Sequence, residues 1–232
     1  IEQVEPIFEQ MLMSLRLDDP GDHAKELIER RQRRENGEAF VNAIDATRLH
    51  AALIPSQVLR IIDNGQDIGY MIINQARGNE WGQTGVIVKV QSRVYHTPDV
   101  AQDTEHKFFI SDDQAQEFWT STITVREKKR SPQQLQAQWH VVSSSIETGV
   151  RDHNDINGTR QIQKQVDVPS WRQQNADRVT PGTEAAMHAK NEDFAWRKPP
   201  SAYLSRVHVA MLGQLLQSHP DQAYGFYAYE QA

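Results

Sequence analysis

The sequence predicts an α+β fold: a long-stranded antiparallel β meander curled into a half-barrel and covered by N-terminal and C-terminal helices. Apolar residues recur every three or four positions before residue 55 and again over 201–218, whereas they alternate with polar residues from Gln57 to Val168. Several alternating segments run about ten residues and have short connections, which is typical of an antiparallel meander. Long twisted strands curl around whatever covers their apolar face, and the helices are the available cover.

Three helices are expected in a helical N-terminal segment, residues 1–55. The first, at about 2–17, is amphipathic, because its apolar residues fall on one side at helical spacing. The second, at about 22–36, is mostly charged and is expected to stop at Gly37 in the left-handed conformation. The third, at about 38–53, ends before a proline.

Residues 56–232 are expected to form an antiparallel β domain. Its clearest element is a hairpin at Asn64-Gly65, because Asn-Gly between two apolar runs is the strongest short hairpin signal. A loop is expected at 79–85, and a second Asn-Gly turn at Asn157-Gly158. Beyond the first hairpin, strands are expected at about 86–95, 106–111, 117–127, 139–150 and 161–168.

The last third of the chain is expected to leave the sheet and return. Residues 171–200 are rich in Gln, Asn, Pro and Gly, which indicates a long surface loop. A fourth helix is expected over 201–218, followed by an aromatic strand at 224–229. Because such a strand rarely ends a domain unpaired, we expect further strands to follow in the full-length protein.

Composition and charge exclude several classes of protein. The 232 residues hold 25 basic and 31 acidic side chains, a net charge of -6 that argues against bulk nucleic-acid binding. No stretch approaches the roughly 18 to 20 apolar residues that cross a bilayer, so no integral membrane segment is expected. The absence of cysteine excludes disulfides, thiolate metal sites and cysteine nucleophiles within these residues.

Catalytic motifs are sparse. The sequence has no G-x-S-x-G and no glycine-rich phosphate loop, so no cofactor is expected. The oxygen-rich run 152–158 is interpreted as a turn, because its spacing puts histidine and lysine where a calcium loop needs acids. One catalytic alternative stays open: hairpin pairing could bring His96 and His106 together with the acidic residues between them, as in a loop-built metal-dependent hydrolase.

The segment Ile-Ile-Asp-Asn-Gly-Gln-Asp-Ile-Gly-Tyr-Met at 61–71 opens a long meander and resembles exported bacterial proteins of the LolA/LolB-like superfamily. Ser-Asp-Asp at 111–113 followed by Glu-Phe-Trp at 117–119 also resembles uncharacterised envelope proteins of this type. The resemblance implies a periplasmic or other extracytoplasmic location and a concave apolar face that holds lipid or a lipidated peptide. The N-terminal helices and residues 171–200 depart from the family pattern, and either could serve as an interaction arm.

The leading hypothesis is therefore a non-enzymatic envelope protein that binds a hydrophobic ligand in a curved sheet. An ordinary closed core is the competing interpretation of the same apolar residues. The residues expected to line the concavity are Tyr70, Ile72, Val88, Val90, Trp119, Ile123 and Val125.

A second hypothesis is a structural or accessory subunit, in which the helix at 2–17 and the strand at 224–229 pair with a partner chain. The basic runs at 30–34 and 126–130 could also form a rim for anionic lipid at a membrane surface or for a partner, although solvated charge explains them more simply.

Overall fold

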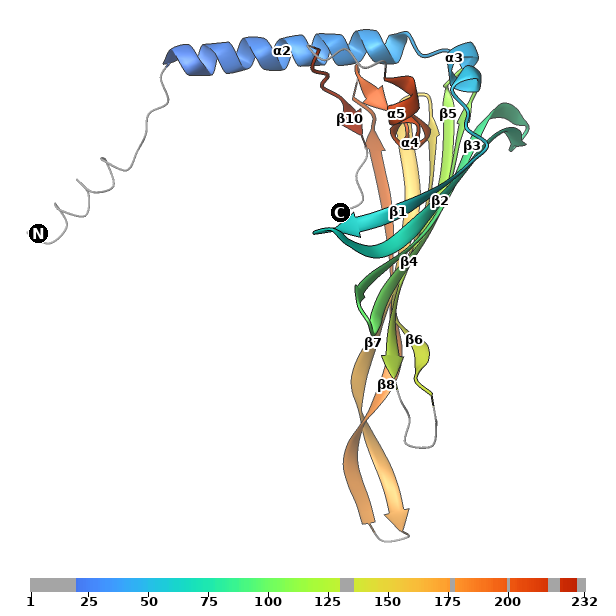
Figure 1. The fold of residues 1–232 in the computed structure, drawn as a ribbon. Helices are drawn as coiled ribbons and strands as arrows, with labels where there is room; N and C mark the ends of the chain where they lie inside the picture. Colours follow the sequence, from blue (N-terminus) through green and yellow to red (C-terminus); the bar gives the residue numbers. More distant parts are fainter. Residues whose placement is uncertain (1–19, 130–135, 176–177, 200, 217–221, 229–232) are drawn as a thin grey trace, which may run out of the picture.

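One antiparallel sheet forms the centre of the molecule, and the strand-rich α+β fold predicted from the sequence is confirmed (Figure 1). The computed structural model describes residues 20–129, 136–175, 178–199, 201–216 and 222–228. The eight strands lie in chain order, so β1 and β8 are the sheet's two edges. They are β1 Ser56–Asp63, β2 Gln66–Glu80, β3 Gln83–Thr97, β4 Val100–Ser111, β5 Gln116–Lys129, β6 Gln138–Asp152, β7 Asp155–Asn175 and β8 Arg178–Arg197.

Two-residue turns join the first three strands. Asn64 and Gly65 have φ of 48° and 77°, which confirms the predicted Asn-Gly hairpin. The prediction of a loop at 79–85 is wrong, because β2 and β3 stay paired as far as Glu80 and Gln83. Trp81 and Gly82 form the turn there, with φ of 52° and 82°. A tryptophan in this conformation is not a turn signal, which is why the sequence did not reveal the hairpin.

The turn expected at Asn157-Gly158 lies four residues earlier than predicted. β6 and β7 are joined through His153 and Asn154, with Asp152 paired to Asp155. Gly158 instead lies inside β7 and faces Gly149 of β6. A Cβ atom on Gly158 would overlap the ring of Phe194, so this glycine serves close packing rather than a turn.

The prediction of a long surface loop at 171–200 is also wrong, because most of this region belongs to a hairpin formed by β7 and β8. Its backbone pairs run from Asp155 with Arg197 to Asn175 with Arg178. β6 pairs with β7 only as far as Lys164, so the outer part of the hairpin is a two-stranded ribbon. The Gln, Asn, Pro and Gly content of residues 171–200 is typical of a loop, which is why the sequence did not reveal these strands.

The helices differ from the prediction in their boundaries. Helix α2 (Pro20–Asn42) runs through Gly37, and α3 (Ala46–Ala51) follows, with the Asp45 side chain accepting a hydrogen bond from Arg48 N at 2.7 Å. Gly37 is needed where α2 approaches residue 225, since a Cβ atom would overlap the carbonyl oxygen of Gly225. The helix expected at 2–17 lies outside the described residues.

The C-terminal region begins with a short strand instead of one long helix. β9 (Tyr203–Leu204) pairs in parallel with β10 (Tyr227–Ala228). β10 is the part of the aromatic strand expected at 224–229 for which the structure describes pairing. Between them lie α4 (Arg206–Ala210) and α5 (Leu212–Leu215). Ser205 caps α4 by accepting a hydrogen bond from His208 N at 3.0 Å, so the helix cannot start at residue 201.

The core lies between one face of the sheet and these helices, and we call that face the covered face and the opposite one the open face. Val86, Val88 and Val90 point from β3 into the core. Phe40 and Ile44 from the N-terminal segment join them, as do Val207, Met211 and Leu215 from the C-terminal helices. Among the described residues, no helix has the length and apolar character needed to cross a bilayer.

Candidate functional site

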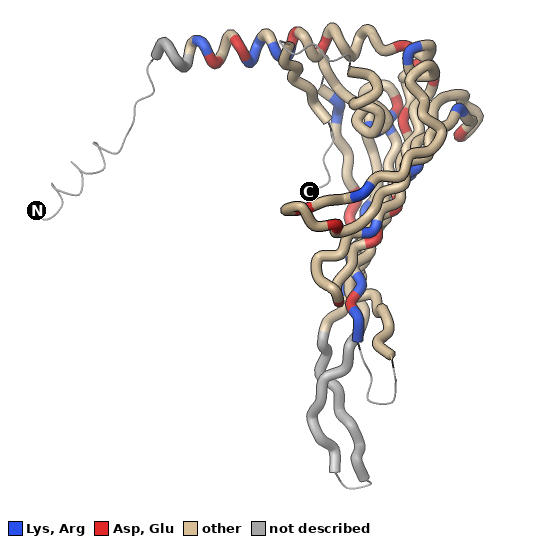
Figure 2. The backbone as a smooth tube through the Cα atoms, in the orientation of Figure 1, with Lys and Arg blue, Asp and Glu red and all other residues tan. Residues whose placement is uncertain are grey.

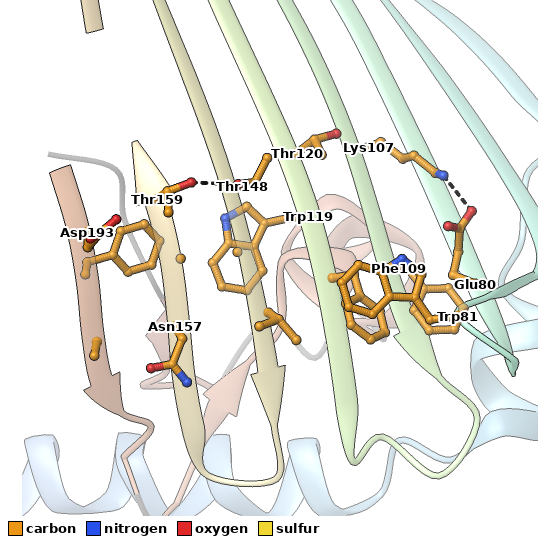
Figure 3. Close-up of a pocket in the computed structure, with 16 residues that line it drawn as sticks. Glu80, Trp81, Lys107, Phe109, Trp119, Thr120, Thr148, Asn157, Thr159 and Asp193 are labelled. Carbon is orange, nitrogen blue, oxygen red and sulfur yellow. Dashed lines mark hydrogen bonds and ion pairs between the residues drawn. The ribbon is translucent and has the colours of Figure 1, made fainter. Parts of the chain in front are cut away.

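A cavity of about 860 Å³ lies on the open face, with the helices behind the sheet (Figure 3). We call it the aromatic cavity. Trp81, Phe109 and Phe118 form one end, and Thr148, Thr159 and Asp193 form the other. The remaining lining residues are Glu80, Lys107, Trp119, Thr120, Gly149, Val150, Asn157, Gly158, Phe194 and Ala195.

The aromatic end is built by the tip of the β2–β3 hairpin, which folds over the open face. Trp81 packs against Phe118 in a tilted arrangement with ring centroids 4.3 Å apart, and the Phe118 and Phe109 ring centroids are 5.7 Å apart. The ion pair between Lys107 Nζ and Glu80 Oε1, at 2.5 Å, fixes the same tip to β4. Trp81 nevertheless keeps 77% of its surface exposed, so a large apolar side chain stands open to the cavity.

The floor of the cavity is the backbone around the glycine pair, Gly149 and Gly158. On the covered face the Trp119 ring lies where a Cβ of Gly149 would stand, and the Phe194 ring lies against Gly158. The two rings are 6.4 Å apart. Because neither glycine has a side chain, both rings lie close to the sheet and border the cavity.

A smaller cavity, of about 370 Å³, lies further along the open face, and we call it the arginine cavity. Asp103 accepts hydrogen bonds from Arg93 Nε at 2.5 Å and Nη2 at 2.8 Å, and from Arg126 Nε at 2.9 Å. The Arg93 hydrogen bonds, followed by those of Arg126, hold the pKa of Asp103 below its usual value. Its other lining residues are Tyr70, Ile72, Gln91, Ser92, Thr104, Glu105, Thr122 and Thr124.

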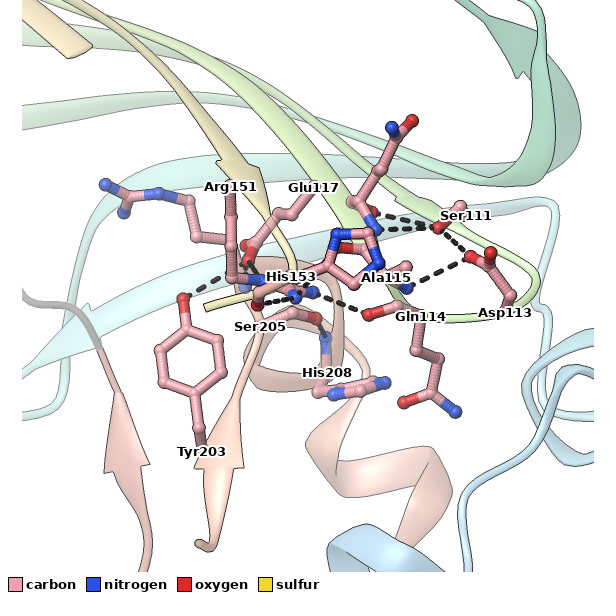
Figure 4. Close-up of polar contacts among 12 residues, drawn as sticks. Ser111, Asp113, Gln114, Ala115, Glu117, Arg151, His153, Tyr203, Ser205 and His208 are labelled. Carbon is pink, nitrogen blue, oxygen red and sulfur yellow. Dashed lines mark hydrogen bonds and ion pairs between the residues drawn. The ribbon is translucent and has the colours of Figure 1, made fainter. Parts of the chain in front are cut away.

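A buried charged network occupies the covered face under α4 (Figure 4). Glu117, with no exposed surface, accepts from Arg151 Nε at 3.2 Å, from Tyr203 Oη at 3.2 Å and from Arg206 N at 2.6 Å. Desolvation, and then the Glu117 charge, raise the pKa of Tyr203. Each carboxylate oxygen is therefore occupied, and the network joins α4 and β9 to the sheet.

Glu147 is the second buried carboxylate of this face. Its oxygens accept from Trp119 Nε1 at 2.9 Å, Arg160 Nη2 at 2.9 Å and Arg206 Nη2 at 2.7 Å. Sequence reasoning missed both glutamates, although a signal was present. Glu117 is two residues from Trp119 on the same strand, so both side chains point to the same, apolar face. A charged group on that face has to be buried and must therefore be paired.

The seven residues expected to line one concavity fall into separate groups. Val88, Val90 and Trp119 are buried in the core, and Trp119 also borders the aromatic cavity. Ile123 and Val125 share the covered face, because their cross-strand partners continue its rows, and they are half-buried. Tyr70 and Ile72 lie on the open face and line the arginine cavity. Whether they bind a ligand stays a prediction.

The residues missed in the aromatic cavity are Trp81, Phe109 and Phe118. Trp81 was assigned to a loop, and the two phenylalanines lie in the phase opposite to Phe108 and Trp119, which belong to the core. The sequence did offer a signal: β4 and β5 each carry aromatic residues at two consecutive positions, which point to opposite faces of the sheet. A half-buried strand needs only one apolar face, so the second set of aromatic residues indicates a further apolar surface.

The histidines considered for a hydrolase are not brought together. His96 lies near the end of β3, whereas His106 is opposite Val90, six residues away along that strand. His106 Nδ1 instead lies 2.5 Å from Ser121 Oγ on the covered face. Burial, and then the charge of Arg206, lower the pKa of His106. The described parts of the chain hold no group of three or more side chains suited to a metal ion.

The basic run at 30–34 and the described part of the second run, 126–129, lie at opposite ends of the sheet and do not form one rim (Figure 2). On α2, three of the arginines pair with glutamates one turn away: Arg30 with Glu26, Arg31 with Glu35 and Arg33 with Glu29. Solvated, paired charge is thus the simplest account of that run.

No protein-family model, no curated protein and no solved structure matches this chain at a significant level.

Proposed function

We propose that this protein is a non-enzymatic binding protein of the cell envelope that holds a hydrophobic ligand, a lipid or a lipidated peptide, against its sheet. The aromatic cavity is the observation that carries the proposal. Its volume of about 860 Å³ falls in the range of roughly 300–1,000 Å³ typical of small-ligand sites. The covered face is filled by the chain's own core, so we assign the ligand to the open face.

The character of the cavity wall supports an apolar ligand. Trp81 and Phe118 present their rings over the cavity, while the ion pair of Lys107 with Glu80 and the hydrogen bond of Thr148 with Thr159, at 3.0 Å, lie around it. Apolar walls with a few fixed polar groups are the usual composition of a ligand site. An exposed aromatic side chain in such a place is more consistent with a binding surface than with a core.

Two finer features belong to the same proposal. We infer that the sheet curls as a half-barrel around α4 and α5, because long strands accumulate right-handed twist against a helical cover. We also infer an extracytoplasmic location, supported by the resemblance of the hairpin meander to exported proteins. Fractionation of the native host tests the location, and recovery in the cytosol would contradict it.

The binding experiment is a titration with the uncharged fluorophore Nile red, whose emission rises in apolar surroundings. Trp81→Ala removes one wall of the cavity and should weaken binding about tenfold, equivalent to about 1.4 kcal/mol. Trp139→Ala is the matched control, since Trp139 packs against Tyr95 and Lys128 away from the cavity. Absence of binding by the unchanged protein, or equal losses in both variants, would refute the proposal.

Assembly with a second copy of the chain is the alternative function, favoured by the edge strand β1. Val58, Leu59 and Ile62 are 73%, 44% and 58% exposed. Gln75 N donates to Pro55 O at 3.1 Å, which sets the hydrogen-bonding phase of β1 against β2. In an antiparallel pair every second residue bonds to the partner strand, so the backbone N–H and C=O groups of Ser56, Val58 and Arg60 face outward.

A second copy fits this edge without repulsion. With Val58 opposite its own counterpart across a two-fold axis, each Arg60 faces a Ser56, and no like charges meet. Multi-angle light scattering measures the outcome directly, and a monomer at high concentration would reject this alternative.

A further inference from the structure

The aromatic cavity and the arginine cavity are neighbours on the open face. Lys107 and Thr120 line the first, and Glu105 and Thr122, the next residues along the same face of β4 and β5, line the second. Residues two apart on a strand are separated by roughly 7 Å. Figure 3 shows Lys107 and Thr120 at one edge of the aromatic cavity.

The arginine cavity holds a cluster of charged side chains. Within the arginine cavity two guanidinium groups share the carboxylate of Asp103, so the cluster of Arg93, Asp103 and Arg126 carries one surplus positive charge. Arg93 and Arg126 keep 33% and 36% of their side-chain surface exposed. A guanidinium has five N–H donors, so each retains donors beyond those used on Asp103. The groups are therefore held in place and can still bind an anion.

One further carboxylate lies between this cluster and the aromatic cavity. Glu105 lines the arginine cavity, and within the described part of the chain no ion pair is recorded for it. Its charge opposes anion binding, whereas Lys107 beyond it is neutralised by Glu80. Counted with Glu105, the formal charge of the arginine cavity is zero, so the surplus positive charge is confined to the cluster of Arg93, Asp103 and Arg126.

We propose that the two cavities form one groove that binds one amphiphile, with its hydrocarbon chain in the aromatic cavity and an anionic head group, a carboxylate or a phosphate, on Arg93 and Arg126. This inference rests on the proposed function, because it assigns the head group of the same hydrophobic ligand. Tyr70, Thr122 and Thr124 line the head-group end and supply hydroxyl groups for its oxygen atoms.

The test is calorimetric titration of laurate, dodecyl phosphate and uncharged monolaurin, each below its micelle concentration. Arg126→Gln removes one charged donor and should weaken the two anions about tenfold while leaving monolaurin unchanged. Asp103→Asn and Glu105→Gln each remove a competing negative charge and should strengthen the anions at least about threefold. The opposite signs cannot arise from unfolding, and thermal melts of each variant check the fold.

The outcomes separate this inference from the proposed function. Preference for one anion over the other identifies the head group as a carboxylate or a phosphate. Equal affinity for monolaurin and the anions, unaffected by Arg126→Gln, overturns the head-group assignment and leaves the hydrophobic site intact. Failure of all three probes to bind refutes both.

Discussion

Replacing Glu117 with glutamine should destabilise the protein far more than an ordinary loss of surface charge. Glu117 is fully buried, and three donors point at its carboxylate: Arg151 Nε, Tyr203 Oη and Arg206 N. Glutamine has one acceptor oxygen, so its NH₂ group must face at least one of these donors. The Arg151 side chain, only 4% exposed, also loses its counter-charge.

Breaking a buried ion pair by removing one partner costs about 3–5 kcal/mol. Arg151 also donates to three backbone carbonyls, of Gln114, Ala115 and His153, which favours the lower part of that range. For a chain of this size each kcal/mol lowers Tm by roughly 2–4 °C, so Tm should fall by at least about 6 °C.

Urea unfolding followed by tryptophan fluorescence measures the loss, and Glu127→Gln is the matched control. Glu127 pairs with Lys129 at 3.3 Å but is 42% exposed, so the same substitution should change the free energy of unfolding by at most about 1 kcal/mol. The double variant Glu117→Gln/Arg151→Met should lose less than the two single variants summed, because it removes both charges. A cost for Glu117→Gln similar to that of the control, or strict additivity, would refute the reasoning.

Two further predictions concern pH and assembly. Burial, and then the Arg151 charge, lower the pKa of His208 from 6.5 to about 4, so between these values the unfolded chain takes up a proton that the folded chain does not. The free energy of unfolding should therefore fall as pH drops from 6.5 to about 4, by as much as about 3 kcal/mol, and unfolding titrations of His208→Leu should show a flatter dependence. Val58→Pro removes a backbone N–H that faces outward and is not bonded to β2, so it should abolish a β1-mediated dimer while Tm stays nearly constant. Light scattering measures the dimer, and a dimer that persists in this variant would contradict the interface.

The sequence revealed elements whose local pattern agrees with their tertiary setting. Asn64-Gly65 suits the hairpin turn, and the valines of β3 alternate because one face packs on the core. Positions governed by distant contacts could not be assigned in this way. Gly37 looks like a helix stop, yet its role is set by Gly225, and Gly158 looks like a turn but accommodates Phe194.

The candidate site was less accessible to sequence reasoning than the fold. Trp119 was named and does border the aromatic cavity, but Tyr70 lies on the opposite face from Val88. The phase between neighbouring strands depends on turn length, and the unrecognised two-residue turn at Trp81 left this phase unknown. The pairing of Asp103 with two arginines likewise depends on cross-strand register.

The contact between α2 and residue 225 has a consequence for the order of folding. Gly225 N donates to Arg33 O at 2.7 Å, and the Phe40 ring lies 5.6 Å from that of Tyr224 and 5.5 Å from that of Phe226. These groups are 184 to 192 positions apart in the chain, whereas the sheet is assembled from successive hairpins. Because the entropy lost on closing a long loop opposes such contacts, the sheet should form first, and on the ribosome α2 can make these contacts only after residues 224–226 have been synthesised.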